Sequence, residues 1–314
     1  MISFSPITIQ NAASLRPMLN TQPFRTCDYT LGAVFQWRAY FHSAFAVIDG
    51  MLVMLATYPN EKVTCFVFPV GDGNLQSALD AIEAHAREVG MSLTYCAVPE
   101  EGLAVLTERY GERAVVSTHR NWADYLYNTD DLIRFPGKRY HTQRNHLNRF
   151  FKDNPSASFV PITETTLPAA LMFFDEYEQY APIDKIIEAE EMLRAKELLA
   201  DALKLQQKAG YIDVGGTIVA LAIGEVVQDT LYVHVEKARV DYAGSYQAIV
   251  SMFARYAAEE DTLYINREDD SGEERLRYSK MSYRPIRLID KYWVTVEDNP
   301  GTANPITSNT GNTL

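Results

Sequence analysis

An internal repeat constrains the fold of this chain more than any other feature. The hexapeptide SFSPIT at residues 3–8 returns as SFVPIT at residues 158–163. Each copy is followed by helical segments, three strand-like runs, an amphipathic helix, a further strand and a further helix, in the same order. A chain of 314 residues is long enough for two domains. The sequence therefore predicts two tandem copies of one α+β unit.

Short turn signals place the two copies in register. In each copy, two turns separate the three strand-like runs, which indicates an antiparallel meander. The turns are Asp49-Gly50 and Pro59-Asn60 in the first copy, and Gly215-Gly216 and Gln228-Asp229 in the second.

These patterns predict the boundaries of the domains. We expect an N-terminal lobe at residues 1–150 and a C-terminal lobe at residues 155–298, joined near residues 151–158. Residues 299–314 are rich in Asn, Thr, Pro and Gly. We expect them to be a flexible tail, because they carry too little apolar surface to order themselves.

Composition limits where such a protein works. The net charge is -12, which argues against a surface that binds nucleic acid everywhere but permits a local basic patch. No stretch approaches 18 consecutive apolar residues and the N-terminus has no leader pattern, so we expect a cytoplasmic protein without an integral membrane segment. Cys27, Cys65 and Cys96 have no metal-ligand spacing and are expected to be reduced thiols in the core.

Four longer segments resemble a known family. An antiparallel meander followed by a helix, a strand, a helix and a last strand is the order of the GNAT acyltransferase fold. The segments are similar to the soluble bacterial family related to the C-terminal domain of phosphatidylglycerol lysyltransferase. This resemblance implies two tandem GNAT-like lobes, with mixed, mostly antiparallel sheets flanked by helices, and an acyltransferase or aminoacyltransferase activity. The segments are DYTLGAVFQWRAYF, DYLYNTDDLIRFPGKRYHTQRNHLNRF, HVEKARVDYAGSYQAI and INREDDSGEERLRYSKMSYRP.

The third meander strand of the second copy holds the candidate catalytic residues. Tyr232, His234 and Glu236 alternate along it and share one face, where the first copy has only apolar residues. In a GNAT-like lobe this strand borders the cleft where an amine meets an acyl group, so Glu236 is the candidate general base. Tyr232 and His234 are further catalytic candidates. The alternative is a solvated face of an antiparallel sheet.

A basic segment precedes the second copy. Residues 134–152 contain six Lys or Arg and no acid. Lys138, Arg139 and Arg149 are expected to form a cationic surface that binds the phosphates of tRNA, of a nucleotide-linked substrate or of coenzyme A. Arg144 falls on the apolar stripe of Tyr140, Leu147 and Phe151, which predicts a buried ion pair. The alternative is an ordinary solvated helix between the lobes.

Polar residues follow the next strand of the second copy. Asn266 and Glu268 are candidate substrate-binding residues because strand ends of such sheets commonly carry function, and Tyr246 is a third candidate. We expect Asp269 and Asp270 to form salt bridges with the basic helix around Arg144. Their spacing does not have the form of an EF-hand, so no metal site is expected.

Three functions remain open from the sequence. The first is transfer of an aminoacyl group from aminoacyl-tRNA to an amine or hydroxyl acceptor, which would be a small molecule or a molecule related to peptidoglycan or lipid. The second is N-acetyl transfer from acetyl-CoA, although RVDYAGSYQ supplies only Gly244 where such enzymes have a glycine-rich pyrophosphate loop. The third is a non-catalytic protein that binds a phosphate-bearing ligand.

Overall fold

The computed structural model describes residues 1–59, 62–177 and 186–298, and two compact units divide them. The first unit comprises Met1–Asp124, Asp269–Glu273 and the chain from Ile289, and the second comprises Tyr125–Glu268 and Glu274–Leu288. This division differs from the expected boundary near residue 150, because residues 125–150 belong to the second unit and the last strand to the first. The expected flexible tail, residues 299–314, lies outside the described residues.

The first unit is built on a seven-stranded sheet with the order β1-β2-β3-β4-β5-β14-β6. Its neighbouring strands are antiparallel, except that β4 and β5 run parallel. The strands are β1 (Ser5–Pro6), β2 (Ala44–Ile48), β3 (Met51–Tyr58), β4 (Val63–Gly71), β5 (Leu93–Val98), β6 (Ala114–Thr118) and β14 (Tyr292–Val296).

The second sheet repeats this arrangement with the order β8-β9-β10-β11-β12-β7-β13. Here β11 and β12 form the parallel pair, as β4 and β5 do in the first sheet. The two tandem GNAT-like lobes expected from the sequence are therefore present. The strands are β7 (Asp124–Asn128), β8 (Ser158–Pro161), β9 (Lys208–Val214), β10 (Thr217–Val227), β11 (Thr230–Ala238), β12 (Tyr264–Asn266) and β13 (Arg287–Ile289).

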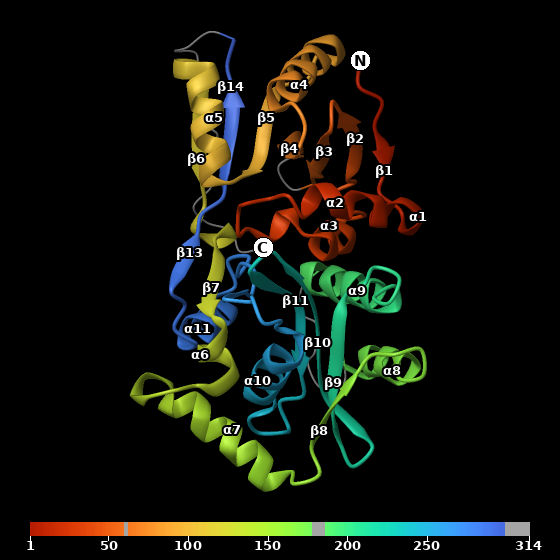
Figure 1. Cartoon of the computed structure of the whole chain (residues 1–314), viewed down its shortest axis with the longest axis vertical. Coiled ribbons are helices and arrows are strands. Elements are labelled where there is room, and N and C mark those ends of the chain that lie inside the picture. The colour runs from red at the N-terminus through yellow and green to blue at the C-terminus, as the bar shows by residue number, and fades with distance from the viewer. Residues whose placement is uncertain (60–61, 178–185, 299–314) are drawn as a thin grey trace. The chain divides into compact units, whose positions relative to one another are not determined.

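The two sheets exchange one strand each. By the order of the repeat, β7 follows β6 in the first copy and β14 follows β13 in the second. Yet β7 lies between β12 and β13, and β14 lies between β5 and β6 (Figure 1). Each sheet is thus completed by a strand that the sequence repeat assigns to the other copy, and this explains why the units do not divide at residue 150.

Helices flank both sheets, and Figure 1 labels them in chain order. The long helix α4 has clear sequence signals at both ends: the Asn74 side chain accepts a hydrogen bond from the backbone N–H of Ser77, and Gly90 ends the helix in the left-handed region. The helices are α1 (Ile9–Ala12), α2 (Arg16–Leu19), α3 (Leu31–Trp37), α4 (Leu75–Val89), α5 (Glu100–Tyr110), α6 (Thr129–Arg134), α7 (His141–Asp153), α8 (Leu167–Tyr177), α9 (Ile186–Ala200), α10 (Ser245–Ala257) and α11 (Glu274–Ser282).

The predicted turns at 49/50 and 215/216 occupy equivalent places, between the first two meander strands of each copy. In both turns the two residues have positive φ, 48° and 82° at Asp49-Gly50 and 60° and 88° at Gly215-Gly216. Such a pair of left-handed residues matches the twist of a two-residue hairpin. Asn60, in the second turn of the first copy, lies outside the described residues.

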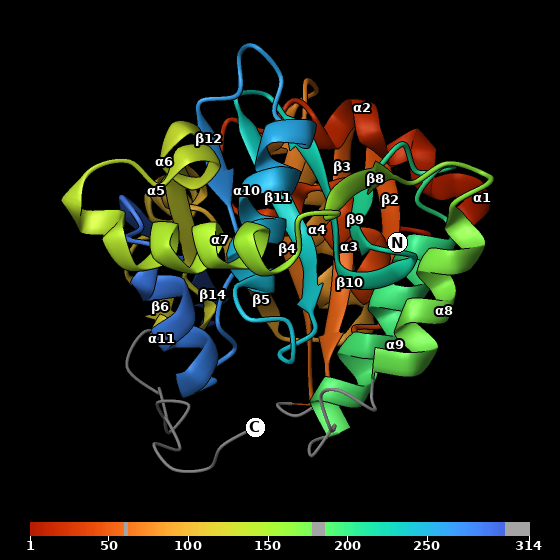
Figure 2. The ribbon, with the colours of Figure 1, turned by 90° about the horizontal axis from the view of Figure 1, so that it is seen from below.

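Helix α7 packs on the core through a different face from the expected one. Tyr140 just before the helix is buried as predicted, but Gln143 and Phe150 follow it into the core, whereas Phe151 is 38% exposed. Figure 2 shows α7 running across the second unit in front of α10. The contact is close because a Cβ on Gly244, just before α10, would lie 2.3 Å from the carbonyl oxygen of His146.

This close approach predicts that Gly244→Ala is strongly destabilising. Gly244 has a φ of 87°, and an added methyl group would also push α7 away from α10. We expect the free energy of unfolding, measured by urea denaturation, to fall by about 3 kcal/mol or more.

Gly216→Ala is the matched control, because Gly216 has a φ of 88° and nothing within 4 Å of its Cβ position. It should cost only about 1 kcal/mol. Equal losses for the two variants would show that α7 does not press on Gly244.

Candidate active site

The second sheet opens beside β11, and the candidate catalytic residues lie at this opening. The parallel pairing of β11 with β12 covers only Thr230 to Tyr232, opposite Tyr264 to Asn266, and β11 continues alone on that side. On its other side β11 carries one residue more than β10 between Val233 and Val235. His234 is therefore the extra residue of a β-bulge, a feature that redirects a side chain next to many active sites. The bulge breaks the alternation of β11: Tyr232 lies opposite Glu225 and Glu236 opposite Ala222, so these two side chains are on different faces, and the expectation that they share one face is wrong.

His234 is held between two glutamates. Its Nδ1 lies 2.8 Å from Oε1 of Glu268 and its Nε2 lies 3.3 Å from Oε1 of Glu225. Burial alone would lower the pKa of His234, but the hydrogen bonds and negative charges of Glu225 and Glu268 outweigh it and raise the pKa to about 9. The imidazole is therefore a cation at neutral pH, which donates through both nitrogens and cannot act as a base there.

Glu236 is fixed by Arg267. The guanidinium donates from Nε at 2.8 Å and from Nη2 at 2.5 Å, and both bonds end on Oε2 of Glu236. Arg267 also lies over the ring of Tyr283, with its guanidinium carbon 4.6 Å from the ring centre. Oε1 of Glu236 accepts no hydrogen bond from the described residues, and the side chain is 11% exposed. One oxygen thus orients the carboxylate while the other stays available.

The other candidate residues of this region have separate environments. Tyr232 is 1% exposed, and the burial of Tyr232 and His234 rules out the solvated-face alternative for these two side chains. Asn266 is buried, and its Oδ1 accepts the backbone N–H of Glu268 at 2.6 Å, which supports the left-handed backbone of Glu268. Tyr246 lies on α10, with its hydroxyl 3.2 Å from that of Tyr177. Asn266 therefore shapes the opening, and sequence analysis missed the roles of Glu225 and Arg267.

The basic segment is less cationic than its composition indicates. Lys138, Arg139 and Arg149 are exposed as expected. However, Arg139 forms an ion pair with Asp131 at 2.5 Å, and Arg149 pairs with Asp153 at 3.3 Å. Each pair cancels part of the positive potential that a phosphate would meet.

The predicted ion pairing of Arg144 with an acid is wrong. Its Nη1 donates instead to two backbone carbonyl oxygens, that of Phe135 at 2.5 Å and that of Gly137 at 2.9 Å. Phe135 has a positive φ of 47° at the end of α6, which leaves its carbonyl without a helical partner. Arg144 therefore stabilises the turn between α6 and α7.

Asp269 and Asp270, which follow β12, do not pair with the basic helix around Arg144 as expected, but with other cations. Asp270 is fully buried and lies 3.3 Å from Nη1 of Arg120, and Asp269 lies 3.6 Å from Nζ of Lys291. These contacts lie within the first unit, and neither partner comes from the basic helix.

Lys291 is the centre of a buried charge cluster that the sequence did not reveal. Its Nζ lies 2.8 Å from Asp28 and 2.8 Å from Asp124, and 3.3 Å from Sγ of Cys27. Burial alone would lower the pKa of Lys291, but Asp124 and Asp28 raise it well above its usual value. Cys27, Asp28 and Asp124 have the donor atoms of a metal site, all within 4.8 Å of one another. The ammonium group of Lys291 already provides the cation that these donors require.

The N-terminus of α10 packs closely against α7. The ideal Cβ position of Gly244 lies 2.3 Å from the backbone carbonyl oxygen of His146, and Ser245 at the first helical position is buried. The backbone N–H of Ser245 donates to the carbonyl of Tyr242 at 3.0 Å, so the first N–H group of the helix already has a partner.

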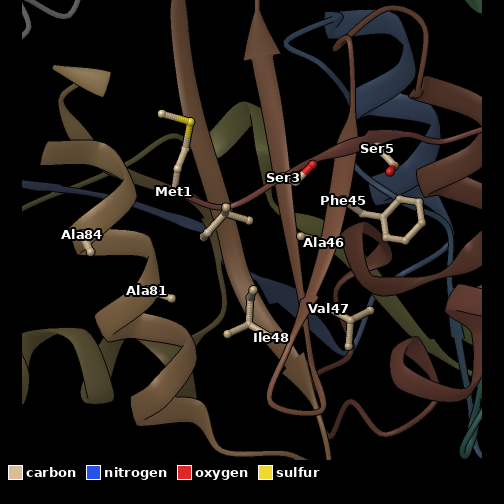
Figure 3. Close-up of a pocket in the computed structure, with 10 residues that line it drawn as sticks. Met1, Ser3, Ser5, Phe45, Ala46, Val47, Ile48, Ala81 and Ala84 are labelled. Carbon is tan, nitrogen blue, oxygen red and sulfur yellow. The ribbon is translucent and has the colours of Figure 1, made fainter. Parts of the chain in front are cut away.

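Each unit also has a surface groove. The groove of the first unit has a volume of ≈ 510 Å³ and lies between the N-terminal segment, β2 and α4; Figure 3 shows its small and apolar side chains, among them Val47, Ile48 and Ala81. The groove of the second unit has a volume of ≈ 520 Å³ and lies between α6, α7, β8 and α10. It is lined by Arg134, Arg144 and Arg255 beside aromatic rings.

No helix in the described ranges combines the length and the apolar character that crossing a membrane requires. All three cysteines are buried and none forms a disulfide, as expected of reduced core thiols.

Comparisons with known proteins agree with the resemblance noted in the sequence. The family model described as phosphatidylglycerol lysyltransferase, C-terminal, matches residues 20–295. A curated relative, an uncharacterised protein of Mycoplasmoides gallisepticum, is 28% identical over 181 residues. The match covers 57% of this chain and 58% of that protein, so the chain spans less than two thirds of the relative's length.

Solved structures show the same fold over nearly the whole chain. A conserved protein of unknown function from Bacteroides thetaiotaomicron is 30% identical, with a TM-score of 0.88 over 95% of this chain and 100% of that one. L-PGS from Bacillus licheniformis is 13% identical, with a TM-score of 0.66 over 95% of each chain. At that identity the second similarity shows the fold alone.

The charge of His234 predicts a pH dependence of stability. A pKa raised from 6.5 to about 9 in the folded state means that the stabilisation is fully present below about pH 6.5 and is lost as pH rises through 9. We expect the difference in free energy of unfolding between the wild type and His234→Gln to shrink over this range by on the order of 3 kcal/mol. Denaturant unfolding at several pH values measures it.

His146→Gln is the control for the substitution itself, because His146 is exposed on α7 and the same change is made at a surface position. A constant difference between wild type and His234→Gln would mean that His234 is neutral in the folded protein.

Proposed function

Because the chain belongs to the phosphatidylglycerol lysyltransferase C-terminal family, we propose that it transfers an aminoacyl group from aminoacyl-tRNA to an amine or hydroxyl acceptor. One observation carries this proposal. At the opening beside β11, Glu236 is oriented by Arg267 through Oε2 while Oε1 stays available for a proton. A carboxylate held in this way can act as a general base.

The transfer balances as an acyl substitution. The acceptor nitrogen or oxygen attacks the ester carbonyl of the aminoacyl-tRNA, and Oε1 of Glu236 takes the proton that the acceptor loses. A tetrahedral oxyanion forms, for which N–H groups on the open edge of β11 are suitable donors. The ester C–O bond then breaks, and the proton passes from Glu236 to the ribose oxygen that leaves.

The charges at the opening suit an aminoacyl group better than an acetyl group. Three carboxylates, Glu225, Glu236 and Glu268, surround two cations, Arg267 and the protonated His234. Three negative and two positive charges leave an excess of one negative charge. An aminoacyl group carries an α-ammonium that this excess attracts, and an acetyl group carries no charge. The name of the family refers to lysyl transfer, and a lysyl group is cationic in the same way.

The two alternatives have less support. Acetyl-CoA would need a pyrophosphate site, and the segment before α10 supplies a single glycine, Gly244, where acetyl-CoA enzymes have a glycine-rich loop. A non-catalytic binding protein would not need a carboxylate such as Glu236, which is held by hydrogen bonds to one of its two oxygens while the other stays available. The acceptor is proposed by class alone, as a small molecule or a molecule related to peptidoglycan or lipid.

We predict that Glu236→Gln lowers the rate of aminoacyl transfer by about 10²- to 10⁴-fold, because the amide keeps the shape but cannot accept the proton. The measurement is release of labelled amino acid from aminoacyl-tRNA into the acceptor, together with the affinity for the tRNA. The affinity should stay within a factor of about three, since the substitution alters chemistry rather than RNA contacts.

Glu260→Gln is the control, as this glutamate is exposed after α10. It should transfer like the wild type. A Glu236→Gln variant with the rate of the wild type would move the base to another residue, and the absence of transfer from every aminoacyl-tRNA and acyl-CoA, with RNA binding retained, would favour the binding protein.

A further inference from the structure

A second cationic segment of the second unit lies at α11 and the residues after it, outside the basic segment singled out from the sequence. Residues 275–287 read RLRYSKMSYRPIR and hold five Lys or Arg and no acid in 13 residues. The whole chain has a net charge of -12. So dense a cationic segment in an acidic protein indicates a local site for a polyanion.

Most of this segment faces solvent. Lys280 is the buried residue of α11, and its Nζ donates at 2.6 Å to the backbone carbonyl of Arg267. Arg275, Arg284 and Arg287 are exposed. Within the described ranges, Arg275 and Arg284 form no ion pair, in contrast to Arg139 and Arg149 of the basic segment, which each pair with an aspartate. Arg275 and Arg284 therefore keep their charge for a partner.

The apolar residues of α11 identify the kind of partner. Tyr278 is 80% exposed, Met281 43% and Leu276 40%. At about 100° per residue, Leu276 and Tyr278 are roughly 200° apart around the helix, so α11 has no single apolar face. A helix that lies in a membrane interface needs such a face. An isolated exposed ring among arginines instead suits stacking on an unpaired base.

We propose that residues 275–287 form an RNA-contacting surface, in which Arg275, Arg284 and Arg287 bind phosphates and Tyr278 stacks on an unpaired base. Arginine binds phosphate oxygens through paired N–H groups. The surface is tied to the candidate site, because Lys280 bonds the carbonyl of Arg267, which orients Glu236. The inference deepens the proposed function, on which it rests, by assigning the surface that meets the RNA of the donor.

Binding of a fluorescent RNA hairpin with an unpaired 3′ end tests the proposal without any transfer. In the full chain, Arg275→Gln, Arg284→Gln and Arg287→Gln together should weaken binding and lower the slope of log K against log salt by about 2, at roughly 0.7 for each lost contact to a single strand. Tyr278→Ala should weaken binding of the hairpin with the unpaired end by about 10-fold and leave a blunt hairpin unaffected.

The matched control removes the same number of arginines from the basic segment, as Arg134→Gln, Arg139→Gln and Arg149→Gln. It should lower the salt slope by less than half as much. Circular dichroism and the melting temperature should show that both triple variants are folded. Arg275, Arg284 and Arg287 are all exposed, so their replacement should leave the protein folded.

Two outcomes would overturn the proposal. One is equal loss of RNA binding in the two triple variants, which would make the effect one of net charge. The other is unchanged RNA binding with lost binding to phosphatidylglycerol vesicles, which would make the surface a membrane contact. Because the readout is binding alone, a protein that binds RNA through α11 but transfers nothing would refute the proposed function and leave this surface intact.

Discussion

The candidate site depends on the short length of one strand pairing in the second sheet. The parallel pairing of β11 and β12 ends at Tyr232 and Asn266. Had the ladder continued, the backbone of β12 would lie beside His234 and Glu236. Instead, the chain after β12 brings the side chains of Arg267 and Glu268 to this place, where they pair with Glu236 and His234. Buried charges are stable only when paired, and the opening supplies each one with a partner.

The first sheet has the same short parallel pairing, with Phe66 opposite Tyr95 and Val67 opposite Cys96. Its corresponding side chains are apolar, and Phe66 and Phe68 are buried. A Cβ on Gly102 would lie 3.0 Å from the ring of Phe68, so α5 packs directly on this ring. The same opening is thus closed by aromatic packing in one lobe and lined by ionised groups in the other, which supports placing the proposed transfer in the second lobe.

The exchanged strands are accompanied by a buried cluster of charges in the first unit, centred on Lys291. Asp124 is the first residue of β7 and Lys291 directly precedes β14, so the buried cluster joins the two points at which the chain passes from one sheet to the other. Removing one partner of such a pair leaves a buried charge without compensation, at a cost of about 3 to 5 kcal/mol. We therefore interpret the cluster as stabilising the fold with its exchanged strands, rather than as a catalytic site.

Much of the fold could be predicted because it depends on local patterns. The repeated hexapeptide and the turns at Asp49-Gly50 and Gly215-Gly216 each report a few neighbouring residues. The destination of β7 and β14 could not be predicted in this way, since a strand of five residues fits either sheet equally well by its own sequence.

Charge partners were predicted less well for the same reason. Nothing near Glu236 in the sequence points to Arg267, which is 31 residues away, and Arg144 has carbonyl partners that no composition reveals. A count of cations favours the basic helix as a phosphate site, although Arg139 and Arg149 each form an ion pair with a nearby aspartate. A count of positive residues is informative only after their neighbours are known.

The central claim is that the second lobe transfers an aminoacyl group, and a competition between donors tests it most directly. Purified wild-type protein would receive a mixture of labelled aminoacyl-tRNAs and labelled acetyl-CoA, with a cell extract as the source of acceptors. The account predicts that label from aminoacyl-tRNA appears in the acceptor fraction while the acetyl label stays on coenzyme A. Transfer of the acetyl label, with the aminoacyl-tRNAs left intact, would contradict it.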